Sequence, residues 1–264
     1  MRITVLGSGQ DGGLPQLGAG HPNDRRAREG EIPERTAASL LVEVGGGRLL
    51  VDASPDLRVQ WWGQVGVPDA VVLTHAHIGH YTGLVHLGLE AANARAVPAY
   101  VTSPMAGFLS TNAPWSRLVE SRNLTLRPGL RHRWHDVDID LIPVPHRDEF
   151  TDTVAVSLDG RALYLPDIDG WDRWPDAERV IGSHELALVD ATFWSADEIP
   201  GTPMDRFPHP AVVDTIARFG HLSTRIVLTH LNHTNPLCDP GSPETGEALT
   251  AGFEIAHDGL MFEL

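Results

Sequence analysis

The stretch THAHIGHY, residues 74–81, places His75, His77 and His80 within six positions, directly after the apolar run 70–73. On a helix, residues i and i+2 point about 200° apart, so His75 and His77 could not face one ion there. A tight turn at the end of a strand can instead aim all three imidazoles into one pocket. Because imidazole is the commonest protein ligand for transition metals, this spacing predicts a metal site at a strand end.

The composition narrows the ligands and the substrate. The 264 residues include 14 histidines but a single cysteine, Cys238. An internal disulfide and a cysteine-built zinc site are therefore excluded, and a metal must be bound by His, Asp or Glu. The net charge of -15, from 35 acidic and 20 basic residues, disfavours nucleic acid, whose phosphates need clustered Lys and Arg. We expect a small-molecule substrate.

The chain carries no targeting or membrane signal that we recognise. No stretch approaches the roughly 18 apolar residues of a transmembrane helix, and the opening MRITVLGSGQ lacks the apolar core of a signal peptide. We therefore expect a cytoplasmic location and no membrane partner. The sequence sets no oligomeric state.

Short apolar runs separated by Gly, Pro and Asp-Gly predict a fold rich in strands. Strands are expected at residues 3–6, 39–44, 48–51, 70–73, 99–102, 140–144, 154–158, 162–165, 186–189, 226–228 and 260–262. Helices are expected at 56–64, 83–93, 105–111 and 210–219, and residues 12–33 are expected to form one long loop. The turns at residues 45–47, 159–160 and 258–259 are typical of tight hairpins. Together these patterns predict one α+β layered domain over residues 1–264.

The segment GSGQDG, residues 7–12, matches the dinucleotide-binding pattern G-x-G-x-x-G after a strand. The residues that follow, beginning with Leu14 and Pro15, cannot form the helix whose N-terminus would bind a pyrophosphate. We therefore interpret the segment as a glycine-rich turn that frames the mouth of an active site.

Three further polar residues close apolar strands in the way that His75 does. They are His146, Asp167 and His230. Strand ends on one edge of a sheet can converge in space, so five histidines and one carboxylate can form a single cluster. That number of ligands is enough for two metal ions.

The order of five short blocks resembles the metallo-β-lactamase superfamily. The blocks are LLVDASPD (49–56), THAHIGH (74–80), VPH (144–146), LYLPD (163–167) and VLTH (227–230). The resemblance implies a four-layer αββα sandwich. It also implies a first metal site of His75, His77 and His146, a second with His80 and His230, and Asp167 between the metals. The resemblance further implies that Asp52 supports the histidine loop without binding a metal itself.

Longer blocks resemble the pyrroloquinoline quinone (PQQ) biosynthesis protein B family over nearly the whole chain. They are VLGSGQDGGLPQLG (5–18), DASPDLR (52–58), YLPDIDGW (164–171), LVDATFW (188–194) and THLNHTNP (229–236). Many members of that family lack the full histidine motif, whereas this chain keeps three of its histidines. The family also commonly has a cysteine cluster where this chain reads GAGHPND (18–24), so a structural zinc is excluded there.

Gly79 departs from the superfamily pattern, which has an aspartate ligand of the second metal at this position. Glycine supplies no donor atom, so the second site keeps only His80, His230 and Asp167. We expect one tight metal and one weak one, or one metal beside a water-filled neighbour. A site with fewer protein ligands can instead suit iron, which uses open coordination positions for dioxygen.

Three functions follow from one or two divalent ions. With Zn²⁺, ranked first, a water whose pKa is lowered towards about 7 would hydrolyse a small molecule, and Asp167 would orient that water or accept its proton. With Fe²⁺, the family resemblance implies hydroxylation of a tyrosine-derived precursor. The third is a metal-dependent carrier without turnover.

The remaining polar candidates lie near the second site or have no partner in the pattern. The catalytic candidates are Asp167, His230 and His233, of which His233 either lines the substrate pocket or shapes a turn. Asn232 and Asn235 either supply hydrogen bonds in that pocket or shape the turn. His21 is expected to be an exposed loop residue. No ligand spacing connects the others, His132, His135, His184, His209, His221 and His257.

Overall fold

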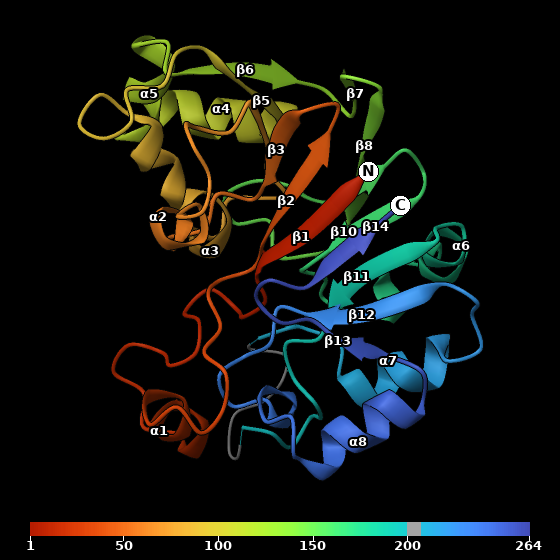
Figure 1. Ribbon diagram of the computed structural model, residues 1–264. Helices are drawn as coiled ribbons and strands as arrows, with labels where there is room; N and C mark the ends of the chain where they lie inside the picture. Colours follow the sequence, from red (N-terminus) through yellow and green to blue (C-terminus); the bar gives the residue numbers. More distant parts are fainter. Residues whose placement is uncertain (200–206) are drawn as a thin grey trace.

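The apolar runs form two seven-stranded mixed sheets that lie face to face (Figure 1). The structure, a computed structural model, describes residues 1–199 and 207–264. The first sheet has the order β14-β1-β2-β3-β4-β5-β6 and the second the order β13-β12-β11-β10-β9-β8-β7. In each sheet one half is antiparallel and the other, β3 to β6 or β10 to β13, is parallel.

The strands are short, as the spacing of turn residues requires. The first sheet consists of β1 (Arg2–Gly7), β2 (Ser39–Val44), β3 (Gly47–Val51), β4 (Ala70–Val72), β5 (Val97–Val101), β6 (Leu124–Pro128) and β14 (Met261–Glu263). The second consists of β7 (Arg131–Trp134), β8 (Val137–Val144), β9 (Thr153–Leu158), β10 (Ala162–Leu165), β11 (Leu186–Asp190), β12 (Arg225–Thr229) and β13 (Glu254–Ile255).

Alternate residues of the strands point to opposite faces of each sheet, and both faces are covered. Between the sheets, fully buried side chains of the first sheet such as Val5 and Val72 pack in one cluster with Val156 and Leu188 of the second. The outer face of the first sheet packs against α2 (Leu57–Gln60), α3 (Ile78–Tyr81), the 3₁₀ helix η1 (Thr82–Leu87), α4 (Ser103–Thr111) and α5 (Trp115–Glu120). The outer face of the second packs against α6 (Ala177–Gly182), α7 (Val212–Phe219) and α8 (Pro243–Thr250). This order of layers confirms the predicted αββα sandwich.

All eleven expected strands are present, with ends shifted by a few residues, and β6, β7 and β13 are additional. β7 and β13 are edge strands of two to four residues, too short to show an alternating pattern. Helices occur in all four expected regions, although in the region 83–93 only residues 83–87 are helical, as part of η1, and turns follow. The sequence does not predict the helices α1 (Pro22–Arg28), α3, α5, α6 and α8, each of which has eight residues or fewer.

Two expectations about connections are wrong. Residues 12–33 are not one loop, because His21 caps α1 and forms a capping box with Asp24. The turn at residues 258–259 is not a hairpin, because it joins β13 of the second sheet to β14 of the first. The turns at residues 45–47 and 159–160 do close hairpins. Within the described residues, no helix has the length and apolar character that crossing a membrane requires.

Candidate metal centre

The candidate site lies where strand ends of the two sheets meet. The six predicted ligands follow strands: His75, His77 and His80 after β4, His146 after β8, Asp167 after β10 and His230 after β12. All six side chains are buried. The structure therefore brings together, in one cluster, residues from four separate parts of the chain.

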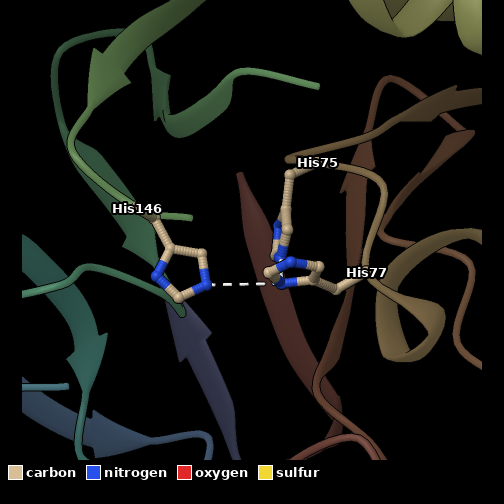
Figure 2. A group of neighbouring side chains, drawn as sticks. All are labelled: His75, His77 and His146. Atoms are coloured by element: carbon tan, nitrogen blue, oxygen red, sulfur yellow. Dashed lines mark hydrogen bonds between the residues drawn. The ribbon is translucent and has the colours of Figure 1, made fainter. Parts of the chain in front are cut away.

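The first group consists of His75, His77 and His146 (Figure 2). Nε2 of His75 lies 2.8 Å from Nδ1 of His77, and Nε2 of His146 lies 3.3 Å from the same atom. A neutral imidazole has one N–H donor and one acceptor nitrogen. Three ring nitrogens that face one point therefore cannot all form hydrogen bonds with one another. Three such nitrogens are a set that Zn²⁺ and similar ions accept.

The second group consists of His80 and His230, with Asp167 between it and the first. Oδ2 of Asp167 lies 3.1 Å from Nε2 of His80 and 3.4 Å from Nε2 of His230, and Oδ1 lies 3.5 Å from Nε2 of His146. Asp167 Oδ2 and both Nε2 atoms are buried and have no hydrogen-bond partner among the described residues. Each such orphaned atom costs about 1–3 kcal/mol, a cost that a bound cation would remove. The donor set therefore fits a divalent metal ion.

The far nitrogen of three imidazoles is hydrogen-bonded to an oxygen, which orients each ring so that its other nitrogen faces the cluster. The Nδ1 partners are Asp52 for His80 (2.8 Å), Thr74 for His75 (3.0 Å) and Thr192 for His230 (3.0 Å). Nδ1 of His146 lies 3.1 Å from Oδ1 of Asp169 but makes no hydrogen bond with the described residues. Asp52, expected to support the histidine loop, lies at the end of β3 and reaches both His80 and Thr74.

Burial and the mutual charges decide the protonation of these groups. Burial lowers the pKa of His75 well below its ordinary value, and the neighbouring His80 lowers it further. Burial opposes the charged form of His80, but the carboxylates of Asp52 and Asp167 outweigh it and raise the pKa. Burial also opposes ionisation of Asp167, yet the imidazoles of His230 and His80 hold its pKa well below the usual range. A neutral His75 and an ionised Asp167 are the forms that bind metal.

Two residues that sequence reasoning did not assign also reach the cluster. Oδ1 of Asp11 lies 3.4 Å from Nε2 of His80. This is the part of the site where the sequence predicts a missing carboxylate, because residue 79 is a glycine. His209 has a ring nitrogen within 4.8 Å of donor atoms of Asp167 and His230. Asp11 lies in the glycine-rich turn interpreted as the mouth of a site, but a lone acid in such a turn is no ligand pattern. No ligand spacing in the sequence connects His209 to the other residues of the cluster.

His233, a predicted catalytic residue, does not join the cluster. Its Nδ1 lies 2.8 Å from Oδ2 of Asp24, and the side chain lines a cavity of about 420 Å³ whose wall also includes Asp11 and Phe193. His21 is the N-cap of α1, and its ring centroid lies 6.0 Å from that of His233. The side chains of Asn232 and Asn235 both hydrogen-bond within this turn, to Thr234 and to the backbone N of Leu237.

Comparison with known proteins places the chain among metallo-β-lactamase-like proteins. The model of the β-lactamase superfamily domain matches residues 47–236. The coenzyme PQQ synthesis protein B of Methylococcus capsulatus is 31% identical, and that of Xanthomonas euvesicatoria is also 31% identical, each over the full length of both chains. The solved structure of Zn²⁺-bound PqqB from Methylobacterium extorquens superimposes with a TM-score of 0.87 at 23% identity, covering both chains fully. A diphosphatase of the PhnP family superimposes with a TM-score of 0.76 at 23% identity, covering 100% of this chain and 98% of the other.

Proposed function

We propose that this chain, which belongs to the β-lactamase superfamily and within it to the family of coenzyme PQQ synthesis protein B, is a metal-dependent hydrolase. Its substrate would be a small molecule, in keeping with the synthesis of a coenzyme for which its relatives are named. The observation that carries the proposal is the convergence of two histidine groups on Asp167. Paired metal sites of this kind are typical of hydrolytic centres.

The donors divide naturally between two ions. His75, His77 and His146 would hold one, and His80 and His230 would hold the other, with Asp167 between them. When bound, a divalent ion supplies a water of lowered pKa and polarises the bond that is to be broken. Zn²⁺ ranks first because the PqqB of Methylobacterium extorquens, which has the same fold, binds Zn²⁺, and because imidazole and carboxylate are donors that Zn²⁺ accepts.

The side chains around the ions would orient the water and move protons. Oδ2 of Asp167 has no hydrogen-bond partner in residues 1–199 and 207–264, and it would orient the attacking water or accept its proton. His209 would donate a proton to the leaving group, since its Nδ1 is fixed by Asp190 at 2.7 Å and its ring lies beside Asp167 and His230. Burial opposes the charged form of His209, but Asp190 outweighs it and raises the pKa, which suits a proton donor. His230 would hold the ion, and His233 would line the path of the substrate.

One observation favours a second candidate, an iron- and dioxygen-dependent hydroxylase that acts on a tyrosine-derived precursor in coenzyme synthesis. The full-length relatives are named for coenzyme PQQ synthesis, and the described site contains imidazole and carboxylate donors, which Fe²⁺ also accepts. The two candidates use the same donors and differ in the ion and in the reaction.

Metal analysis followed by two assays separates them. The protein is purified without added metal or chelator, both in air and anaerobically, and its metal is measured by elemental analysis. We expect one or two equivalents of zinc per chain, unaffected by air, and hydrolysis of a phosphoester, lactone or amide that a chelator abolishes. Iron near one equivalent, with dioxygen uptake in the presence of tyrosine-like substrates, would favour the hydroxylase. Protein without metal under both conditions would contradict both candidates.

A further inference from the structure

We propose that Asp11 is a ligand of the second ion and supplies, from the glycine-rich turn after β1, the carboxylate that Gly79 cannot supply. This inference rests on the proposed function, because it adds a donor to the same centre. It concerns the part of the site for which the sequence predicts a missing ligand, and it changes the expectation of one tight and one weak metal to two tight metals.

The distances suit a shared ion better than direct pairing. Oδ1 of Asp11 lies 3.4 Å from Nε2 of His80 and 3.8 Å from Nε2 of His230. Both Nε2 atoms are buried and have no hydrogen-bond partner among the described residues. Donors at about 2.0–2.2 Å from a tetrahedral ion are roughly 3.4 Å apart, whereas N–H···O hydrogen bonds are shorter, at about 2.9 Å. Asp11, His80 and His230 thus have the spacing of ligands around one ion.

Gly79 is the residue that makes room for Asp11. A Cβ atom added to Gly79 would lie 2.0 Å from Oδ1 and 2.9 Å from Cα of Asp11, closer than real Cβ atoms approach other atoms. Gly79 lies in α3 and is not among the glycines with positive φ, so the turn itself does not require glycine. The carboxylate of Asp11 therefore occupies the space that a side chain at position 79 would need.

The loop that carries Asp11 is held on both sides by backbone hydrogen bonds. The N–H of Gly9 donates to the carbonyl of Thr36 at 2.9 Å, and the N–H of Gln10 donates to the carbonyl of Leu231, the neighbour of His230, at 2.8 Å. The turn then closes with a bond from Gly13 to Gln10 of 2.7 Å. The side chain of Asp11 is 30% exposed and lines the same cavity as His233. A donor fixed in this way needs little reordering to bind an ion.

Titration with Zn²⁺ tests the assignment without relying on activity. The chelator-treated chain and its variants are titrated by calorimetry, and the zinc that remains after dialysis is counted by elemental analysis. Asp11→Asn removes the charge at nearly constant shape, and Gly79→Ala displaces Asp11. The matched controls are Asp136→Asn, whose side chain is 99% exposed, and Gly107→Ala, where an added Cβ meets no atom within 4 Å.

We expect two equivalents of zinc in the unaltered chain and in both controls. In Asp11→Asn and Gly79→Ala the second equivalent should bind at least about tenfold more weakly, while the first stays unchanged. Two tight equivalents in Asp11→Asn, or a single equivalent in the unaltered chain, would overturn the assignment of Asp11. If neither the unaltered chain nor any variant binds zinc, the proposed function is overturned together with the assignment of Asp11.

Discussion

Oδ2 of Asp52 lies 2.8 Å from Nδ1 of His80, while Oδ1 of the same carboxylate accepts a hydrogen bond from the backbone N–H of Thr74. One fully buried carboxylate therefore fixes both the start of the histidine loop and the orientation of a candidate ligand. A proton on Nδ1 of His80, held by Asp52, leaves Nε2 free to bind an ion.

Replacing Asp52 by asparagine should weaken metal binding by the second group. We expect a loss of about 10–100-fold in zinc affinity, because the amide neither accepts as strongly from Nδ1 nor adds its charge to the site. The measurement is a Zn²⁺ titration of the chelator-treated protein, with Asp140→Asn, half exposed at 51%, as the control. Unchanged affinity in Asp52→Asn would show that His80 is oriented by other contacts.

His77→Ala should lose metal and activity but keep its fold. The ring of His77 faces His75 and His146 at the end of a strand, so its removal leaves the cores between the layers intact. Elemental analysis, circular dichroism and thermal unfolding measure the three properties, and His257→Ala, at an exposed position, controls for loss of an imidazole. Retained metal together with full turnover would show that the site is wrongly assigned.

Glu198 should make stability depend on pH. Burial raises the pKa of this carboxyl to about 7, although Thr234 and the backbone N–H of Trp194 donate to it. Since the folded state binds this proton more tightly than the unfolded state, its contribution is complete below about pH 4.5 and is lost as the pH rises through about 7. The loss should be about 1–3 kcal/mol in the free energy of unfolding.

Urea unfolding at pH 5 and pH 8 checks this, with a chelator present so that metal binding does not contribute. Glu198→Gln should remove this part of the difference between the two pH values. The exposed Glu120→Gln, at 63% side-chain exposure, should behave like the unaltered chain. An identical pH dependence in Glu198→Gln would refute the expectation.

The hydroxyl of Tyr164 is buried without a hydrogen-bond partner in the described part of the chain. Since such a group costs about 1–3 kcal/mol, Tyr164→Phe should keep the free energy of unfolding or increase it by about 1 kcal/mol. Urea unfolding of the metal-free protein measures this, with the partly exposed Tyr100→Phe as the control. A clear loss of stability would mean that the hydroxyl has a partner after all.

The strands and the convergence of the six candidate residues could be predicted because both depend on local pattern. Each buried strand is a short apolar run, and each candidate ligand follows such a run, so the meeting of strand ends brings the six side chains together. Short helices such as α1 escape this reasoning, because their stability comes from packing and from caps such as His21 rather than from periodicity.

Asp11 and His209 could not be predicted for a related reason. Their places depend on contacts between distant segments, namely the turn after β1 against Leu231 and His209 against Asp190. At position 79 the sequence shows a missing carboxylate, but only the space between Gly79 and Asp11 shows where another carboxylate lies.

The candidate ligands of the first group come from both sheets, since His77 follows β4 and His146 follows β8, 69 residues away in the chain. An ion held between them would act as a reversible cross-link at the edge of the sandwich, and it would stabilise the chain by binding to the folded form rather than to the unfolded one. Separation of the two sheets would then require release of the ion. The lifetime of the folded chain would follow the rate of metal dissociation as well as the strength of the core.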